Sequence, residues 1–175
     1  MSTRNDVLQA IAHGAIVQAL GGRSVADESE SWLAEPGATF VTLTQAGRLR
    51  GCIGTLEAHQ SILIDVKRNA CGAAFRDPRF PALSYRELGE TAIHVSLLTP
   101  LEPMAFVDEA DVLARLRPGV DGLVLEFGHY RATFLPQVWE QLPEPQSFLI
   151  QLKRKAGLPG DFWAEGVRLF RYEIH

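Results

Sequence analysis

The sequence has few cysteines and no apolar run long enough to cross a membrane. Its two cysteines, Cys52 and Cys71, form no C-x-x-C pair and join no Cys/His cluster with structural-zinc spacing. No charged-then-apolar leader opens the chain, and no apolar stretch approaches the roughly 20 residues of a membrane-spanning helix. These absences predict a cytoplasmic protein with reduced thiols, no metal site and no membrane partner.

An excess of positive charge and the common cofactor fingerprints are also missing. The formal net charge is −4, which gives no general basic surface for a phosphate backbone. The chain contains no P-loop, no G-x-G-x-x-G at a strand-to-helix turn, no G-x-S-x-G elbow and no H-E-x-x-H. We therefore expect no nucleic-acid partner and no cofactor.

What remains is the composition of an ordinary globular protein, with 46% hydrophobic and 22% charged residues. Period-two alternation and helical spacing of apolar residues alternate along the chain, without repeats or an interdomain linker. Strands are predicted at 38–44, 48–56, 91–98, 122–127, 130–135 and 167–174, and helices at 5–20, 61–74, 108–116, 136–142 and 148–156. Hairpins interleaved with helices favour an α+β fold with a mainly antiparallel sheet.

The most unusual stretch is 49–55, with the sequence LRGCIGT. In a regular strand Leu49 and Ile53 would face the core, while Arg50, Cys52 and the Cα of Gly54 would share the other face. A glycine inside a strand often marks a bulge or a close approach of another group. The alternatives are structural, because free cysteine is commonly buried and Arg50 fits a solvated strand edge.

Two further segments bear on this face. In 77–81, with the sequence DPRFP, the proline ends the preceding helix, and Asp77 either holds the turn with Arg79 as its ion partner or has a functional role. In the strand 91–98, His94 and Ser96 alternate with apolar residues. They would lie beside Cys52 if the two strands were neighbours in register, whereas a one-residue slip would separate them.

Four blocks, taken in order, resemble the signatures of the AMMECR domain. They are 49–55, 77–81, 95–100 and 132–139. Prokaryotic members of that family are labelled component A of the AmmeMemoRadiSam system. The resemblance implies one α+β domain over 1–175 with two unequal lobes in one compact unit, a motif-bearing core at about 38–174 and an N-terminal helix at about 5–20.

The resemblance also implies partners and site residues. Prokaryotic members are encoded beside a Memo-like protein, similar to class III extradiol dioxygenases, and a radical SAM protein, while the family has no established biochemical activity. Two of the blocks carry its signature residues, which are Arg50, Gly51, Cys52, Gly54, Asp77, Arg79 and Phe80. We expect these residues, together with Ser96, to form the binding surface.

Three functional hypotheses follow. The leading one is a binding or accessory component, in which Arg50 and Arg79 hold an anionic small molecule or a partner's carboxylate. The second is a cysteine-dependent enzyme, with Cys52 as nucleophile and His94 as base. The third, a metal site of Cys52, His94 and Asp77, has no supporting spacing and ranks last. Whether the protein is an enzyme stays open.

Overall fold

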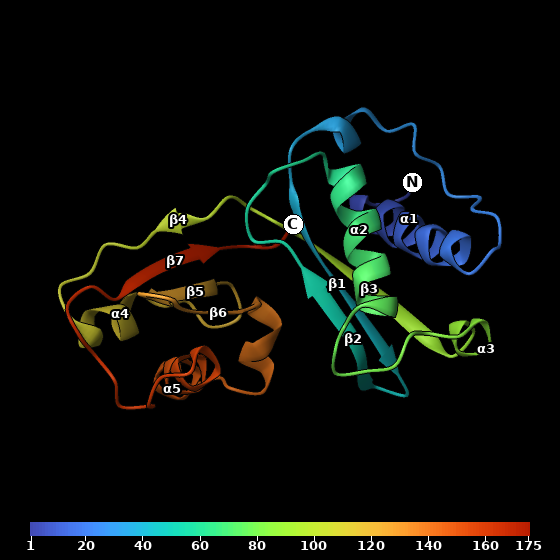
Figure 1. Ribbon diagram of the computed structural model, residues 1–175. Coiled ribbons are helices and arrows are strands. Elements are labelled where there is room, and N and C mark those ends of the chain that lie inside the picture. The colour runs from blue at the N-terminus through green and yellow to red at the C-terminus, as the bar shows by residue number, and fades with distance from the viewer. The chain divides into compact units, whose positions relative to one another are not determined.

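The computed structural model describes residues 1–175 and divides into two compact units, one of residues 1–100 with His175 and one of residues 101–174. Each unit combines helices with an antiparallel sheet (Figure 1), which confirms the predicted α+β class. No helix is both long enough and apolar enough to cross a membrane.

The first unit consists of a three-stranded sheet with two long helices on one face (Figure 1). Its elements are α1 (Arg4–Ala19), η1 (Ser31–Ala34), β1 (Ala38–Gln45), β2 (Arg48–Gly54), α2 (Ile62–Phe75), α3 (Tyr85–Leu88) and β3 (Thr91–Leu98). The strand order is β2-β1-β3, so β2 is an edge strand. Helix α2 packs on β1 and β2, and α1 packs on α2 and β3.

Local sequence explains where the long helices begin and how closely they pack. Thr3 caps α1, with Asp6 completing a reciprocal capping box, so the helix begins one residue before the predicted start at residue 5. Ser61 caps α2, since its Oγ accepts from the Ile64 N–H at 3.3 Å. The buried face of α2 is rich in alanine and glycine, which brings its backbone close to the sheet.

The predicted hairpin of the first unit is present. Strands β1 and β2 are joined by Ala46 and Gly47, both with positive φ, as a tight hairpin turn requires. On β1, Val41 and Leu43 are fully buried toward the helices, and Thr42 lies on the opposite face. The helices therefore cover one face of the sheet and leave the Thr42 face to other contacts.

A β-bulge interrupts β2 at Arg50. Leu43 pairs with Gly51, but the next residue, Thr44, pairs with Leu49, so Arg50 has no partner on β1. The predicted alternation of side chains between the two sheet faces is therefore wrong for the residues before Gly51. Leu49 shares the face of Thr44 and is 43% exposed instead of facing the core. Arg50 turns to the helix-covered face.

The second unit holds a four-stranded antiparallel sheet of order β4-β7-β5-β6 (Figure 1). Its elements are β4 (Glu102–Pro103), α4 (Glu109–Arg115), β5 (Gly122–Phe127), β6 (Tyr130–Phe134), η2 (Pro136–Glu140), α5 (Pro145–Ala156) and β7 (Arg168–Tyr172). Helix α5 packs against β5 and β6. In its core Trp139 stacks on Phe148 with the ring centroids 3.8 Å apart, and the indole N–H donates to the Asp121 carbonyl.

Candidate functional site

Arg50 is enclosed and paired on the helix side of the sheet. Only 8% of its side chain is exposed, and its Nε donates to Glu87 Oε1 at 3.1 Å while its Nη2 donates to the Pro81 carbonyl at 2.9 Å. Glu87 also accepts from Gln45, which lies on the Leu43 face of β1. The expectation that Arg50 shares a face with Cys52 is therefore wrong, and the bulge is the reason.

The same pair fixes the charge of Glu87. The Arg50 guanidinium, followed by the backbone N–H of Ser84, lowers the pKa of Glu87 to about 2. The Arg50 Nη1 atom is buried and has no hydrogen-bond partner. A ligand could reach this last donor only if the surrounding side chains opened, so Arg50 is not an accessible anion-binding group in this conformation.

Asp77 protects the free edge of β2. Its Oδ2 accepts from the backbone N–H of Cys52 at 3.0 Å and from Arg79 Nη2 at 2.7 Å, and its Oδ1 accepts from Arg79 Nε at 3.0 Å. Arg79 is the main cause that holds the pKa of this carboxyl well below its usual range. Because the Cys52 N–H is taken, another strand cannot use it for pairing.

Phe80 completes the contact between the first two signature blocks. Two guanidinium groups lie over its ring, with the Arg50 Cζ 5.8 Å and the Arg79 Cζ 5.5 Å from the ring centroid. Packing also explains both glycines of the motif. A Cβ at Gly51 would lie 2.1 Å from the Ala73 carbonyl oxygen, and one at Gly54 would lie 2.2 Å from the Phe40 ring.

Cys52 and His94 lie on the same sheet face, but they are not neighbours. Strand β1 separates β2 from β3, and Thr42 pairs with Cys52 on one side and with His94 on the other. Two strand spacings, roughly 10 Å, therefore separate their backbones. The half-buried Cys52 has its Sγ 3.4 Å from Thr42 Oγ1. The condition under which His94 would lie beside Cys52, that the two strands be neighbours, is therefore not met.

The other candidates of that face are spread over it. Ser96 pairs with Phe40 in the next row, opposite Gly54, and is buried. Asp77 meets Cys52 only through the backbone N–H. No group of three histidine, cysteine or acidic side chains lies close enough together to hold a metal ion. The structure therefore does not gather Cys52, His94 and Asp77 into a site.

A pocket lies directly beside the LRGCIGT motif. It measures about 410 Å³ and is bounded by the end of β2, the following loop and one side of α2. Its lining residues are Ile53, Thr55, His59, Gln60, Arg68, Asn69, Gly72 and Arg76. Two motif residues, Ile53 and Thr55, thus line a cavity, whereas Arg50 and Cys52 do not line it.

A buried polar network supports this pocket from below. The Asp65 side chain is fully buried and accepts hydrogen bonds at both carboxylate oxygens. Its donors are the Thr39 N–H and Oγ1, Thr55 Oγ1, Gln60 Nε2 and Asn69 Nδ2, at 2.7 to 3.1 Å. Because Thr55, Gln60 and Asn69 are held by this network, the polar wall of the pocket is fixed before any ligand arrives.

The two arginines of the pocket were missed by the sequence reasoning. Arg68 and Arg76 are exposed and have no carboxylate partner. Arg68 Nη1 donates to Gln60 Oε1, and Arg76 Nη2 donates to the Arg68 carbonyl, each at 3.3 Å. A signal was present, since residues 68, 72 and 76 recur at a spacing of four, with glycine in the middle, although Arg76 is the C-cap of α2 rather than part of the helix.

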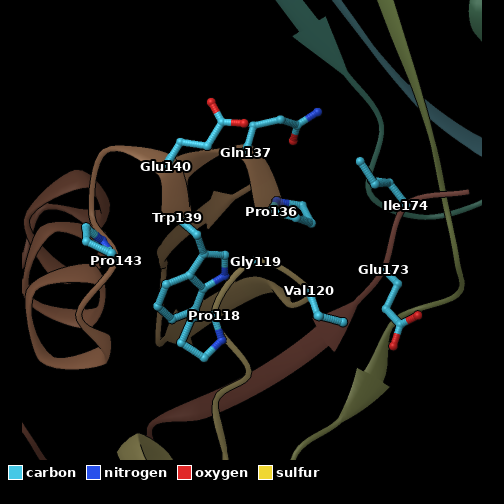
Figure 2. A pocket seen from close by; sticks show the side chains of 10 residues that line it. All are labelled: Pro118, Gly119, Val120, Pro136, Gln137, Trp139, Glu140, Pro143, Glu173 and Ile174. Carbon is cyan, nitrogen blue, oxygen red and sulfur yellow. The ribbon is translucent and has the colours of Figure 1, made fainter.

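A second pocket lies in the second unit (Figure 2) and measures about 540 Å³. The fourth signature block supplies Pro136, Gln137 and Trp139 to its wall. Figure 2 shows Glu140 on one side of the pocket and Glu173 on the other, and no arginine or lysine lines it. Of its two carboxylates, Glu173 pairs with Arg117 at 2.9 Å, and the lining itself offers no cationic side chain to an anionic ligand.

Comparison with known proteins places the four blocks in one family. The family model described as AMMECR1 matches residues 9–175. The chain belongs to the AMMECR1 family. The match includes all four signature blocks and confirms the resemblance inferred from them.

Relatives and a solved structure agree with the AMMECR1 assignment. A protein of Methanocaldococcus jannaschii is 39% identical over 127 residues, which are 71% of this chain and 63% of that protein. A protein of Methanothermobacter thermautotrophicus is 40% identical over 136 residues, 77% of this chain and 71% of that protein. The crystal structure of an uncharacterised protein from Pyrococcus horikoshii matches with a TM-score of 0.88 at 29% identity, covering 98% of this chain and 90% of the other. The AMMECR1 fold therefore extends over nearly the whole chain.

Proposed function

We propose that this AMMECR1-family protein is a binding component that acts in the cytoplasm with Memo-like and radical SAM proteins, through the pocket beside its LRGCIGT strand. The observation that carries the proposal is the cavity of about 410 Å³ walled by Ile53 and Thr55 of that motif. This volume falls within the range of small-molecule sites. Two free thiols support a reducing compartment.

The contacts of the signature residues favour binding over catalysis. Arg50 is occupied by Glu87, and Asp77 by Arg79 and the Cys52 N–H. A general base must reach the proton that it takes within about 3 Å, and His94 is one strand too far from Cys52. The signature residues thus hold the strand and the post-helix segment in place, and the adjacent pocket is left for a ligand.

Arg79 is the signature cation that remains accessible to a partner. Its side chain is 55% exposed even though it pairs with Asp77. An arginine in this setting is suited to a carboxylate on another protein, because its planar fork carries five N–H donors. Partner docking at Arg79 and ligand binding in the pocket would therefore both take place close to the LRGCIGT strand.

The experiment is a binding measurement between purified proteins. We expect the chain to form a complex with the Memo-like or the radical SAM protein in calorimetry, and hydrogen exchange in that complex to slow at residues 48–60 and around Arg79. Absence of a complex with both proteins would overturn the partner assignment. A complex that protects only distant segments would overturn the proposed surface.

A cysteine-dependent enzyme is the second candidate, favoured by one observation. Cys52 is half-buried on the sheet face that the helices leave uncovered, with its sulfur 3.4 Å from Thr42 Oγ1. The conservative variant Cys52→Ser separates the two functions. Partner binding should survive in Cys52→Ser if the protein is a binding component, whereas a thiol enzyme would lose turnover in a reaction assayed with its partners.

A further inference from the structure

The pocket beside the motif presents uncompensated positive charge in a protein that is acidic overall. The net charge is −4, yet Arg68 and Arg76 line one cavity and neither forms an ion pair. By contrast, Arg50 and Arg79 are each held by a carboxylate. Two like charges facing one cavity repel each other, so an anion placed between them would be attracted by both.

Helix geometry brings the two arginines to one place. Arg76 is the C-cap of α2, eight positions after Arg68, and its Nη2 reaches the Arg68 carbonyl at 3.3 Å. Gly72, halfway between them in the sequence, also lines the pocket. A Cβ at Gly72 would lie 3.0 Å from Ile53 Cγ2 and would narrow the cavity. Both arginines therefore border the pocket, with the Arg68 guanidinium bonded to Gln60 and the Arg76 guanidinium bonded to the Arg68 carbonyl.

The nearest buried carboxylate, Asp65, does not line the pocket. Asp65 lies beneath the wall, and both of its oxygens already accept from the side chains above and beside it. Glu57 lies 3.5 Å from His59 at the exposed rim. The residues that line the cavity therefore include two guanidinium groups, an imidazole and two amides, and no carboxylate.

We infer that this pocket binds the phosphate group of a small organic phosphate, with Arg68 and Arg76 as its cationic ligands and His59 at its mouth. A phosphate monoester carries nearly two negative charges near neutral pH, which matches two guanidinium groups with forked donors. The cavity of about 410 Å³ exceeds the needs of the phosphate alone, and Ile53 supplies an apolar wall for an organic body. This inference rests on the proposed function, since it names the ligand class of the proposed pocket.

The test is a titration of the full chain followed by amide NMR. The probes are ribose 5-phosphate, inorganic phosphate and ribose, at constant ionic strength set with sodium chloride. We expect saturable shifts at Thr55, His59, Gly72 and Arg76 with both phosphates, tighter binding of ribose 5-phosphate, and no shifts with ribose. If inorganic phosphate binds more tightly than ribose 5-phosphate, the claim that the pocket also holds an organic group is overturned. If the shifts never saturate, the claim of a specific phosphate site is overturned.

Charge-neutral variants test the residues named. Arg68→Gln and Arg76→Gln should each weaken phosphate binding about tenfold, because each removes one charge-assisted contact. Arg86→Gln is the matched control, since Arg86 is an exposed arginine of α3 outside the pocket. An equal loss of phosphate affinity in all three variants would show that binding depends on the net charge of the protein and not on this pocket, and would overturn the inference. If the protein forms the partner complex but binds no phosphate, this inference alone is overturned. If it binds phosphate but forms no partner complex, only the proposed function is overturned.

Discussion

The Arg50 guanidinium donates to both carboxylate oxygens of Glu87, at 3.1 and 3.3 Å, although the two residues are 37 positions apart. The pair joins the bulge of β2 to helix α3. Arg50 also holds the Pro81 carbonyl at the end of the second signature block. The arginine of the LRGCIGT motif is therefore an anchor for the segment that follows α2, and its removal should be felt in stability.

Arg50→Ala should lower the free energy of unfolding by about 2 kcal/mol. The substitution leaves Glu87 and the Pro81 carbonyl without their shared donor, and a broken buried pair costs about 3 kcal/mol or more before allowance for the partial exposure of Glu87. Urea denaturation measures the change. Arg48→Ala, at an exposed residue of the same strand, should stay within about 0.5 kcal/mol of the parent. Equal effects of the two variants would contradict an anchoring role.

As the pH is lowered from about 5 to about 2, the free energy of unfolding should decrease. The pKa of Glu87 is about 2 in the folded protein against an ordinary 4.5, so the unfolded chain binds more protons in this range. Asp77, whose pKa is also lowered, acts in the same direction. Urea midpoints measured across this pH range should therefore fall less steeply in Glu87→Gln than in the parent. Parallel curves would show that the pair contributes nothing to the pH dependence.

Gly51→Ala should destabilise the protein by about 3 kcal/mol. The new Cβ would lie 2.1 Å from the Ala73 carbonyl oxygen, and backbone cannot move aside as a flexible side chain can. Gly89→Ala is the control, because a Cβ there meets nothing within 4 Å and the backbone is right-handed helical. Thermal unfolding of the two variants decides the matter. A mild effect at Gly51 would mean that α2 shifts readily away from β2.

The sequence predicted the elements of the first unit well where local chemistry decides them. The strand expected at 38–44 and the helix expected at 61–74 match β1 and α2 closely, because β-branched alternation and the Ser61 cap are local signals. The face of His94 was also right, since it follows from alternation within one strand. These features need no knowledge of what packs against them.

The site was predicted less well because long-range pairing decides it. The bulge at Arg50 is visible only in the pairing with β1, and it reverses which face the arginine takes. The order β2-β1-β3 inserts Thr42 between Cys52 and His94, a relation that no spacing within the chain reveals. Arg68 and Arg76 became candidates only once α2 was placed beside the end of β2.

Thiol labelling addresses the enzyme alternative directly. In the native protein Cys52 should react with iodoacetamide faster than Cys71, because burial raises the pKa of Cys71 and less of it is thiolate. Mass mapping after short exposure distinguishes the two. Labelling of Cys52 only after unfolding would make it a packing residue and end the enzyme hypothesis.

His94→Ala then tests whether His94 assists the thiol. With β1 between the two strands, the Cys52 labelling rate should change less than about twofold, because proton transfer needs hydrogen-bond contact or one bridging water. Thr42→Val removes the hydroxyl that does lie beside the sulfur, 3.4 Å away, and should change the rate more than His94→Ala does. A rate at least about tenfold lower in His94→Ala alone would show that the histidine reaches Cys52 in solution. That result would favour the cysteine-dependent enzyme over the binding component, because only the enzyme hypothesis requires an activated thiol at Cys52.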